Sequence, residues 1–363
     1  MRVLLVANKD ITLYLFRKEF IEELVKLNHE VYILSPYGEK LGYFRDIGVG
    51  LIDYSIDRRG KNPLKDVQIL YKYNRIIKKI MPDYVYTYTI KPNIYMGIIS
   101  RFRNIRFIPT ITGLGSAMNH EGLFNRMIIQ LYKVSFKKAH VIFFQNSVNL
   151  EWFKSRINNR VSTRLVNGSG VNLEKFMYSE LNLTGKTKFL FLGRIMKDKG
   201  IEEFLFASKA LKNIYHSDVE FTIAGFIEDD YKDQIEKLQS EGVINYIGFI
   251  DDTYLELIKC TALVLPSYHE GLSNVLLEAQ STGRPVIATD IPGCRETFID
   301  GITGLAIKVK NCIDLFEKMK NFHLLSDVQK YEMSIHGRKH IEQNFDRKSV
   351  VNEYIRIIQD GGK

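Results

Sequence analysis

The stretch that most constrains the fold spans residues 261–283, TALVLPSYHEGLSNVLLEAQSTG. Its continuous apolar run, Ala262–Leu265, predicts a strand buried on both faces of a parallel sheet. Pro266 ends that strand, and a helix that Ser273 or Asn274 could cap follows after a short loop. A buried strand, a loop and a capped helix in this order are typical of an α/β chain with parallel strands.

Two carboxylates lie near the start of this helix. Glu270 falls in the loop, and Glu278 falls about one turn inside the helix. A helix N-terminus attracts anions through its N–H groups and its dipole, whereas acidic side chains repel phosphate and suit hydroxyl groups. A sugar nucleotide supplies both kinds of partner, because it carries a diphosphate and sugar hydroxyls. The stretch therefore predicts a sugar-nucleotide site.

The residues around the two glutamates also carry a family resemblance. The run EGLSNVLLEA followed by GRPVIATD resembles the retaining glycosyltransferases of family GT4, which have the GT-B fold. The resemblance covers essentially the whole chain and is strongest over residues 188–307. It implies an α/β protein with two Rossmann-like doubly wound domains that face a central cleft. It also implies that Glu270 contacts the donor sugar and Glu278 the ribose hydroxyls, and that the nucleotide site includes Gly271, Leu272, Ser273 and Asn274.

A second motif predicts where the diphosphate binds. An expected strand at residues 188–192 ends at Gly193-Arg194, and Lys199-Gly200 opens the next helix. A guanidinium and an ammonium at one strand-to-helix turn can bracket a diphosphate, and Gly193 permits close backbone approach. Two surface cations are the alternative. The G-R-x4-K-G pattern is similar to the donor diphosphate site of GT4, in which the segment matching Phe249 and Ile250 lies beside the base.

These residues suggest how transfer is catalysed. Arg194, Lys199 and the N–H groups at Ser273 and Asn274 would stabilise the leaving diphosphate, so no metal and no other cofactor is expected. The candidate catalytic residues are Arg194, Lys199 and Glu270, the last of these at the donor sugar. The resemblance implies retention of anomeric configuration. Because no carboxylate nucleophile can be assigned, a front-face mechanism is the hypothesis.

The first half of the chain alternates strands and helices. Strands are expected near residues 2–7, 30–34, 84–87, 106–112 and 141–145, and helices near 14–27, 64–80, 92–102 and 123–138. The turn after the first strand, residues 8–11, contains no glycine. Neither 113–118 nor 168–170 completes the G-x-G-x-x-G fingerprint of dinucleotide binding. An NAD-dependent oxidoreductase is therefore a weak alternative.

The acceptor is expected at the first domain. The segment ITGLGS at 111–116 follows a strand and is similar to a GT4 subgroup that assembles bacterial surface polysaccharides and lipid-linked glycans. Many GT4 members carry a histidine where this chain has Thr112-Gly113. The acceptor-side candidates are Thr112, Gly113, Gly115, His120 and Arg17. His120 lines the acceptor site or lies in a solvated loop, and Arg17 meets an acceptor phosphate or bulk water.

The charge of the chain is uneven. Residues 1–180 hold 28 Lys and Arg against 15 Asp and Glu, or +13, and residues 181–363 hold 23 against 27, or −4. A basic half indicates an anionic partner, either nucleic acid or anionic lipid. The helix at 124–138 places Arg126, Lys133 and Lys137 on one stripe, so it is a core helix with a basic edge or an interfacial helix. No apolar run reaches the ~18 residues of a membrane span.

Domain boundaries are expected where periodicity breaks. Glycine and asparagine interrupt the pattern at 166–175. We expect an acceptor-binding Rossmann-like domain at 1–170 and a nucleotide-sugar-binding Rossmann-like domain at 171–345. A last helix within 346–363 is expected to cross back to the first domain, as the resemblance implies.

Together these features predict a glycosyltransferase (EC 2.4.1.-). The expected donor is a UDP-sugar, UDP-N-acetylhexosamine or another UDP-hexose, and the expected acceptor is a polyprenyl-diphosphate-linked saccharide. Three cysteines and no signal peptide predict a cytoplasmic protein, and the basic half would hold it on the inner face of the membrane. A nucleotide-sugar epimerase or hydrolase is the alternative within the fold. A nucleic-acid-binding protein would explain the charge but not Arg194, Lys199, Glu270 and Glu278 together.

Overall fold

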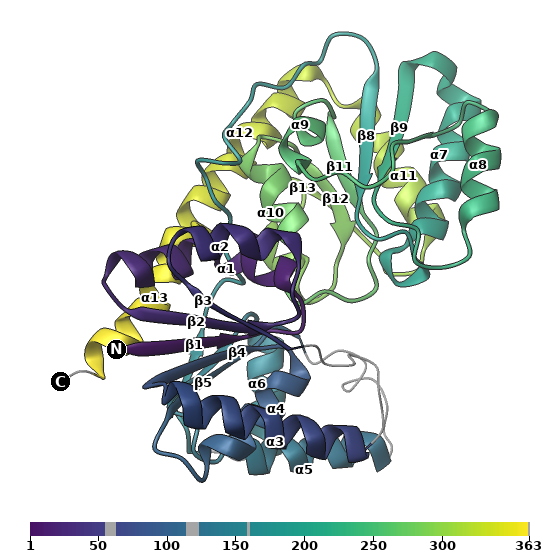
Figure 1. Cartoon of the computed structure of the whole chain (residues 1–363). Helices are drawn as coiled ribbons and strands as arrows, with labels where there is room; N and C mark the ends of the chain where they lie inside the picture. Colours follow the sequence, from purple (N-terminus) through teal and green to yellow (C-terminus); the bar gives the residue numbers. More distant parts are fainter. Residues whose placement is uncertain (55–62, 114–122, 158–159, 362–363) are drawn as a thin grey trace. The chain divides into compact units, whose positions relative to one another are not determined.

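The protein consists of two compact units. The computed structural model describes residues 1–54, 63–113, 123–157 and 160–361. Unit 1 comprises Met1–Ser169 and Lys348–Lys363, and unit 2 comprises Gly170–Arg347. In each unit the described strands form one parallel sheet with helices on both faces (Figure 1). The expected doubly wound α/β fold is confirmed for each unit, and their arrangement about a cleft stays a prediction.

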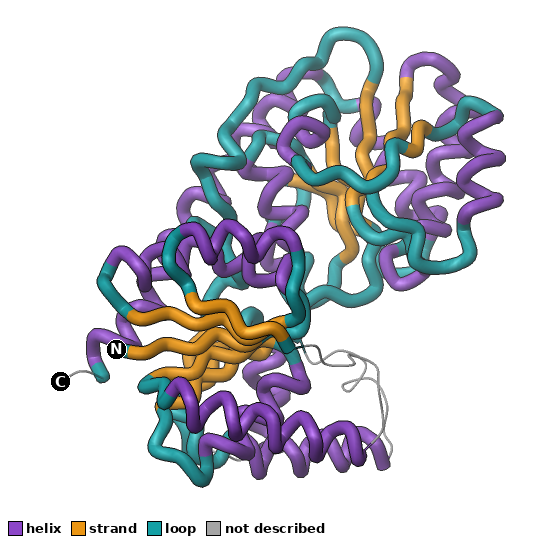
Figure 2. The backbone as a smooth tube through the Cα atoms, viewed as in Figure 1, coloured by secondary structure: helices purple, strands orange, loops and turns teal. Residues whose placement is uncertain are grey.

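Unit 1 is built around a sheet in the order β3-β2-β1-β4-β5-β6-β7. Its elements are β1 (Arg2–Val6), α1 (Asp10–Lys26), β2 (Glu30–Ser35), the 3-10 helix η1 (Glu39–Leu41), α2 (Gly42–Asp46), β3 (Gly50–Asp53), α3 (Pro63–Ile80), β4 (Tyr84–Tyr88), α4 (Ile90–Ser100), β5 (Arg106–Ile111), α5 (Leu123–Ser135), β6 (Ile142–Phe144), α6 (Ser147–Ile157), β7 (Thr163–Leu165) and α13 (Arg347–Asp360). Figure 2 shows strands of this sheet side by side, with helices beside them.

Successive side chains along each strand point to opposite faces of this sheet, and both faces are buried. In β1, Leu4 and Val6 face a core completed by α3, α4, α5 and α6. Val3 and Leu5 face the opposite core, which α1, α2 and α13 complete. Helix α13 is tied to this second core because Tyr86 donates a hydrogen bond from its hydroxyl to the carbonyl oxygen of Tyr354 at 2.9 Å. The last helix therefore packs on the first sheet.

Unit 2 has a sheet in the order β10-β9-β8-β11-β12-β13. Its elements are β8 (Thr187–Leu192), η3 (Lys197–Lys199), α7 (Ile201–Tyr215), η4 (His216–Asp218), β9 (Val219–Ala224), α8 (Lys232–Ser240), β10 (Asn245–Tyr246), α9 (Thr253–Leu257), β11 (Ala262–Leu265), α10 (Asn274–Ser281), β12 (Val286–Thr289), η5 (Arg295–Thr297), β13 (Gly304–Ile307), α11 (Cys312–Leu324) and α12 (Asp327–Asn344). All four residues of β11 are buried, as a strand covered on both faces requires.

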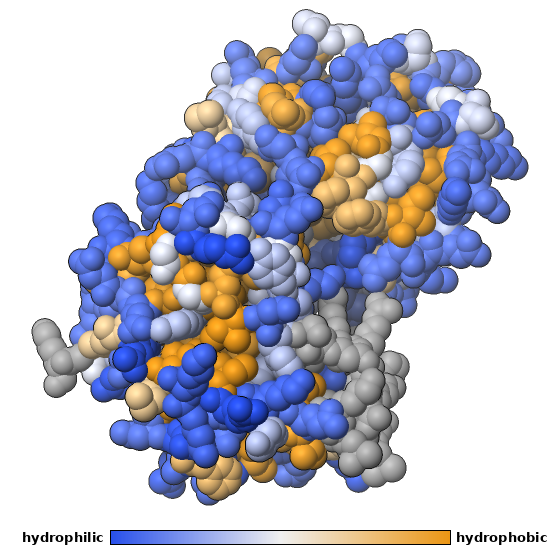
Figure 3. All heavy atoms as spheres, in the orientation of Figure 1, coloured by the Kyte–Doolittle hydropathy of each residue, from blue (hydrophilic) through white to orange (hydrophobic). Residues whose placement is uncertain are grey.

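Several elements differ from the sequence-based expectation. The helix expected to reach residue 138 ends at Ser135. Strands β3 and β7 were not expected, because both are short and neither is fully buried, so neither has the apolar run of a central strand. The visible face of unit 1 is apolar between α2 and α3 (Figure 3). None of the helices in the described ranges is both long and apolar enough to cross a bilayer.

Candidate functional site

The two loops that carry the predicted donor residues leave neighbouring strands of unit 2. Strand β8 pairs with β9 on one side and with β11 on the other. The chain runs from β8 to β9 and β10 and then returns to the opposite side of β8 as β11. Such a reversal leaves a crevice at the carboxyl ends of the two central strands, where α/β sheets bind ligands. Arg194 and Lys199 follow β8, and Glu270 follows β11.

An ion pair joins these two loops. The Nζ atom of Lys199 lies 2.5 Å from Oε1 of Glu270, and the two side chains are 18% and 13% exposed. Gly200 makes this approach possible, because its φ is +73° and a Cβ there would lie 2.1 Å from the carbonyl oxygen of Pro266. Lys199 and Glu270, predicted separately from the sequence, therefore form one half-buried pair.

Gly193 and Arg194 lie beside this pair in the sequence but are more accessible. The Gly193 N–H donates to the carbonyl oxygen of Ala224 at 3.0 Å, and a Cβ on Gly193 would meet no atom within 4 Å. Arg194 is exposed, and its Nη1 lies 2.6 Å from Oε2 of Glu228. The glycine thus leaves open space, and the guanidinium lies at the surface, where an anionic ligand can reach it.

The start of α10 differs in one respect from the prediction. Ser273 occupies the N-cap position, but its side chain makes no capping hydrogen bond. Its N–H donates to the carbonyl oxygen of Gly293 at 2.8 Å, so this N–H already has a partner within unit 2. The N–H groups of Asn274 and Val275 have no intrahelical partner in helix geometry. These two groups are the candidate helix donors toward an anion, and the binding role of the Ser273 N–H stays a prediction.

The remaining predicted residues of this segment divide between site and core. Leu272 is 7% exposed and belongs to the core, and Ile250 packs against the same core. Gly271 is held in place because Gly293, at φ +90°, lies against its carbonyl oxygen. The Leu272 side chain is therefore committed to the core, whereas the Ile250 side chain stays partly accessible.

Glu278 is a partly buried residue whose carboxyl has an unusual ionisation. Thr253 donates a hydrogen bond from its hydroxyl to Oε2 of Glu278 at 3.3 Å. Burial raises the pKa of Glu278 to about 7, against the attraction of Arg347 and Lys175. Near neutral pH the carboxyl is thus only partly ionised in the folded protein. A hydrogen-bond donor that favours the ionised form would lower the pKa of this carboxyl.

This ionisation predicts a pH-dependent stability. Well below pH 4.5 the Glu278 carboxyl is protonated in both the folded and the unfolded state and does not affect stability. As pH rises through 4.5 toward 7, the unfolded state ionises first and stability is lost. We expect Glu278→Gln to be more stable than wild type by about 2 kcal/mol at pH 8, with a difference that nearly vanishes at about pH 4. Urea unfolding at the two pH values tests this, and an equal difference at both would contradict it.

An aromatic pair lies near the same edge of the sheet, and the sequence analysis selected only Phe249 from it. Phe249, which follows β10, stacks on Phe226, which follows β9, with ring centroids 4.1 Å apart and planes at 12°. The rings are 51% and 59% exposed. The signal was present in the sequence, because the triplet Gly-Phe-Ile occurs at 225–227 and again at 248–250. An exposed stacked pair offers a flat apolar surface to a planar ligand.

The structure describes three of the five acceptor-side candidates, Thr112, Gly113 and Arg17. Thr112 and Gly113 directly follow β5 in unit 1, whereas Gly115 and His120 lie outside the described residues. Arg17 is only 4% exposed, so the alternative of a surface arginine is wrong. Its guanidinium lies 4.6 Å from the ring centroid of Tyr88, and its Nη1 donates to the hydroxyl of Ser169 at 2.9 Å.

Unsatisfied polar atoms gather around Arg17. The described structure gives no hydrogen-bond partner to Nε of Arg17, Oδ1 of Asn8, the hydroxyl of Tyr88 or Oγ1 of Thr89, all of which are buried. Asn8 follows β1 and Thr89 follows β4, and these strands pair in register at Val6 and Thr87. The order of the sheet reverses between β1 and β4, and α/β sheets bind ligands outside such a reversal, so these atoms mark the candidate crevice of unit 1. Buried polar groups without partners call for a ligand or water.

The metal prediction remains untested. Within the described ranges, no group of three or more His, Cys, Asp and Glu side chains is placed to hold a metal ion. The cysteines Cys260 and Cys294 are buried thiols, and burial raises the pKa of Cys260 to about 12. Metal-independent activity stays a prediction that chelation experiments can test.

Comparison with protein families covers both units. Residues 2–146 match the family model "Glycosyl transferase 4-like", and residues 174–338 match "Glycosyl transferases group 1". The second range contains Arg194, Lys199, Glu270 and Glu278. Neither an oxidoreductase nor a nucleic-acid-binding protein is favoured by these matches.

The similarity to individual relatives extends along nearly the whole chain. An N,N'-diacetylbacillosaminyl-diphospho-undecaprenol alpha-1,3-N-acetylgalactosaminyltransferase of Campylobacter jejuni is 26% identical over 98% of this chain and 98% of its own length. The capsular polysaccharide biosynthesis glycosyltransferase CapM of Staphylococcus aureus is 26% identical over 92% of this chain and 90% of its own. The structure of Anabaena HepE in complex with UDP has a TM-score of 0.79, with 13% identity over 99% of this chain and all of that one. The protein therefore belongs to the GT4-type glycosyltransferases of the GT-B fold.

Proposed function

We propose that this glycosyltransferase moves a sugar from a UDP-sugar, first of all a UDP-N-acetylhexosamine, to a lipid-diphosphate-linked saccharide in bacterial surface polysaccharide assembly. The observation that carries the donor half is the Lys199–Glu270 ion pair at the carboxyl edge of the unit 2 sheet. The acceptor half is supported by the Campylobacter relative, whose name gives an undecaprenol-diphosphate-linked sugar as acceptor.

The donor would lie across the loops of unit 2. Arg194, Lys199 and the N–H groups of Asn274 and Val275 would bind the diphosphate, with Gly193 leaving room for it. The ribose hydroxyls would donate hydrogen bonds to Glu278, which would lower the pKa of that carboxyl below its value in the empty protein. The base would lie on the stacked rings of Phe226 and Phe249. Glu270 would hold Lys199 in place and contact the sugar.

Transfer exchanges one bond at the anomeric carbon for another. The bond from this carbon to the UDP oxygen breaks, and the acceptor oxygen bonds to the same carbon. Negative charge develops on UDP, where Lys199 and Arg194 stabilise it without a metal ion. In the front-face mechanism the acceptor proton passes to the departing phosphate, and the configuration is retained. No carboxylate nucleophile is required on the opposite face of the sugar.

The acceptor diphosphate would bind at the crevice of unit 1. Arg17 has a cationic group and an unpaired Nε there, and Tyr88 and Thr89 each have an unpaired buried hydroxyl. These groups are donors suited to phosphate oxygens. Thr112 and Gly113 follow the next strand, since β4 pairs with β5, and they would line the saccharide side. This extends the predicted acceptor site to residues that the sequence analysis did not select.

Tyr88→Phe tests the acceptor site with the loss of a single oxygen. We expect the KM for the lipid-diphosphate acceptor to rise about tenfold, since one hydrogen bond to a charged group is lost, with an unchanged KM for the UDP-sugar. The matched control is Tyr84→Phe at the other end of β4, where the hydroxyl donates to the carbonyl oxygen of Ile358. Equal acceptor KM values in wild type and Tyr88→Phe would show that this hydroxyl does not bind the acceptor.

The proposed acceptor also determines where the enzyme works. A lipid-linked saccharide stays in the bilayer, so the enzyme has to reach the membrane surface to use it. The +13 charge of residues 1–180 supports a peripheral position on the inner leaflet of the cytoplasmic membrane, where anionic lipids attract Lys and Arg.

A transfer assay tests the function directly. Each UDP-hexose and UDP-N-acetylhexosamine is incubated with a polyprenyl-diphosphate-linked saccharide, and both UDP and the lengthened lipid are measured. We expect one UDP per lengthened lipid and no UDP without acceptor. UDP release that does not depend on acceptor would instead identify a hydrolase, and conversion of the sugar on UDP would identify an epimerase.

A further inference from the structure

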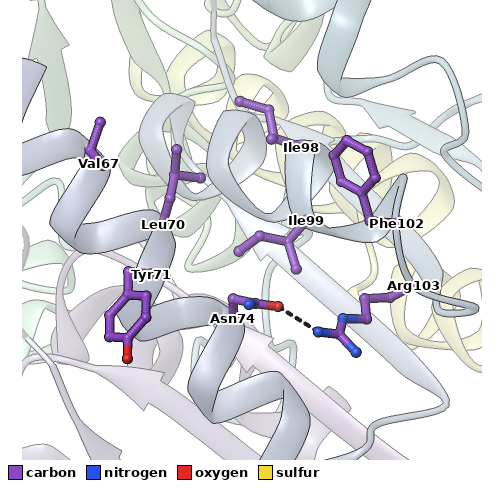
Figure 4. A pocket seen from close by; sticks show the side chains of 8 residues that line it. All are labelled: Val67, Leu70, Tyr71, Asn74, Ile98, Ile99, Phe102 and Arg103. Atoms are coloured by element: carbon purple, nitrogen blue, oxygen red, sulfur yellow. Dashed lines mark hydrogen bonds between the residues drawn. The ribbon is translucent and has the colours of Figure 1, made fainter.

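An open groove of about 410 Å³ lies between helices α3 and α4 of unit 1 (Figure 4). Its apolar lining consists of Val67, Leu70, Tyr71, Ile98, Ile99 and Phe102. The side chains of Asn74 and Arg103 are hydrogen-bonded to each other at 3.0 Å and complete the lining. The groove lies on the outer side of the two helices, because α3 buries a different stripe, Ile69, Tyr73, Ile77 and Ile80, in the core.

The apolar lining is unusually accessible. Phe102 is 80% exposed, Tyr71 is 64% exposed and Val67 is 63% exposed. Residues 67, 71 and 74 recur at the helical repeat of α3, so they form a continuous stripe and not scattered surface residues. A groove with exposed aromatic walls marks a surface that a partner covers.

The charge of the segment that forms the groove is mainly positive. Residues 63–113 contain nine Lys and Arg and two acidic residues, Asp66 and Asp83. On α3, Arg75 and Lys78 lie at helical spacing next to Tyr71 and are exposed. Phe102 stands between Arg101 and Arg103 in the sequence. Aromatic side chains that alternate with cations are typical of surfaces at a membrane interface.

We propose that this groove docks the enzyme on an anionic phospholipid bilayer, with an acyl chain between α3 and α4 and lipid phosphates on the surrounding cations. The charge of the groove and its open apolar lining are complementary to the two parts of such a lipid. This inference rests on the proposed function, since a lipid-linked acceptor requires work at the membrane. It places the contact on α3 and α4, and α4 also packs against α5, whose basic stripe the sequence had suggested as an interface.

Vesicle co-sedimentation of the full chain tests the docking surface. Wild type is measured on vesicles of phosphatidylglycerol with phosphatidylcholine and on vesicles of phosphatidylcholine alone. Two double variants are compared with wild type. The aromatic variant carries both Tyr71→Ser and Phe102→Ser, and the basic variant carries both Arg75→Ser and Lys78→Ser. We expect wild type to bind only the anionic vesicles. The aromatic variant should bind about tenfold more weakly, and the basic variant about 25-fold, at roughly fivefold per cation.

Matched controls come from unit 2. Phe206→Ser with Ile214→Ser removes two exposed apolar residues of α7, and Lys232→Ser with Lys237→Ser removes two exposed cations of α8. Both controls should bind vesicles as wild type does. All variants should keep the thermal shift with UDP and transfer to acceptor in detergent, so a failure of docking is distinguishable from a failure of the proposed function.

Several results would overturn the inference. These are equal binding of wild type to both vesicle types, vesicle binding that survives the aromatic substitutions, or equal losses in the α7 and α8 controls. If the aromatic variant bound vesicles normally but lost activity only with long-chain acceptors, the groove would hold the acceptor lipid instead. A dimeric wild type that the aromatic substitutions convert to monomer would identify a second copy of the chain as the occupant.

Discussion

Lys199→Met is expected to lower kcat by about 100- to 1,000-fold, the usual cost of removing one group that stabilises charge in a transition state. The Lys199 ammonium is held against Glu270 and is largely shielded from water, so its charge is poorly screened. It is already in position before the reaction. Charge on the departing diphosphate would then be stabilised without rearrangement of the loop, and methionine removes that charge while retaining most of the volume.

Steady-state kinetics with saturating UDP-sugar and acceptor measures this effect. The matched control is Lys197→Met on the same 3-10 helix, where the lysine is 63% exposed and pairs with Glu202 at 3.6 Å. The control should keep kcat within about twofold, since exposed pairs contribute little. A kcat for Lys199→Met within threefold of wild type would remove Lys199 from the catalytic residues.

Arg284→Met is expected to destabilise unit 2 by about 3 to 5 kcal/mol. The side chain is 1% exposed and donates to the carbonyl oxygens of Ser179 at 2.5 Å and Ile258 at 2.6 Å, and also to that of Thr282. Methionine would leave these oxygens buried without donors, at about 1 to 3 kcal/mol each. Relief of the buried charge offsets part of this cost, because burial already lowers the pKa of Arg284.

Thermal unfolding measures the change. For a unit of this size the expected fall in Tm is roughly 10 °C. Arg295→Met is the control, because Arg295 is half exposed and pairs with Asp290 at the surface. A Tm loss for Arg284→Met no larger than that of the control would mean that water can replace the guanidinium.

The regular part of the fold was predictable from local pattern. Apolar strands such as Ala262–Leu265 are buried on both faces, and this requirement is visible in the sequence itself. Strand β7 was missed because Thr163, Arg164 and Leu165 show no apolar run; its position depends on pairing with β6. Long-range pairing of this kind is set by tertiary contacts, which the local sequence does not encode.

The donor site was predictable in its members but not in its contacts. Lys199 and Glu270 were selected because their motifs resemble those of GT4 in the same order along the chain. Only the structure shows that the two side chains form an ion pair, and that this pair depends on Gly200. The backbone partner of the Ser273 N–H could not be predicted locally, because that partner, Gly293, is twenty residues away in the chain. The unpaired atoms of Asn8, Tyr88 and Thr89 could not be found from the sequence, since burial without a partner is a property of the packed unit.

The central claim is that the carboxyl edge of the unit 2 sheet binds the UDP part of a sugar donor. The most direct test is thermal unfolding with UDP, GDP, CMP or ADP, each with and without EDTA, for wild type and Glu278→Gln. A ligand at 100 times its Kd stabilises the native state by about 2.7 kcal/mol. The account predicts that UDP alone raises the Tm of wild type, that EDTA does not change this shift, and that Glu278→Gln reduces it. No shift with any nucleotide, or the same shift with all four, would contradict the account.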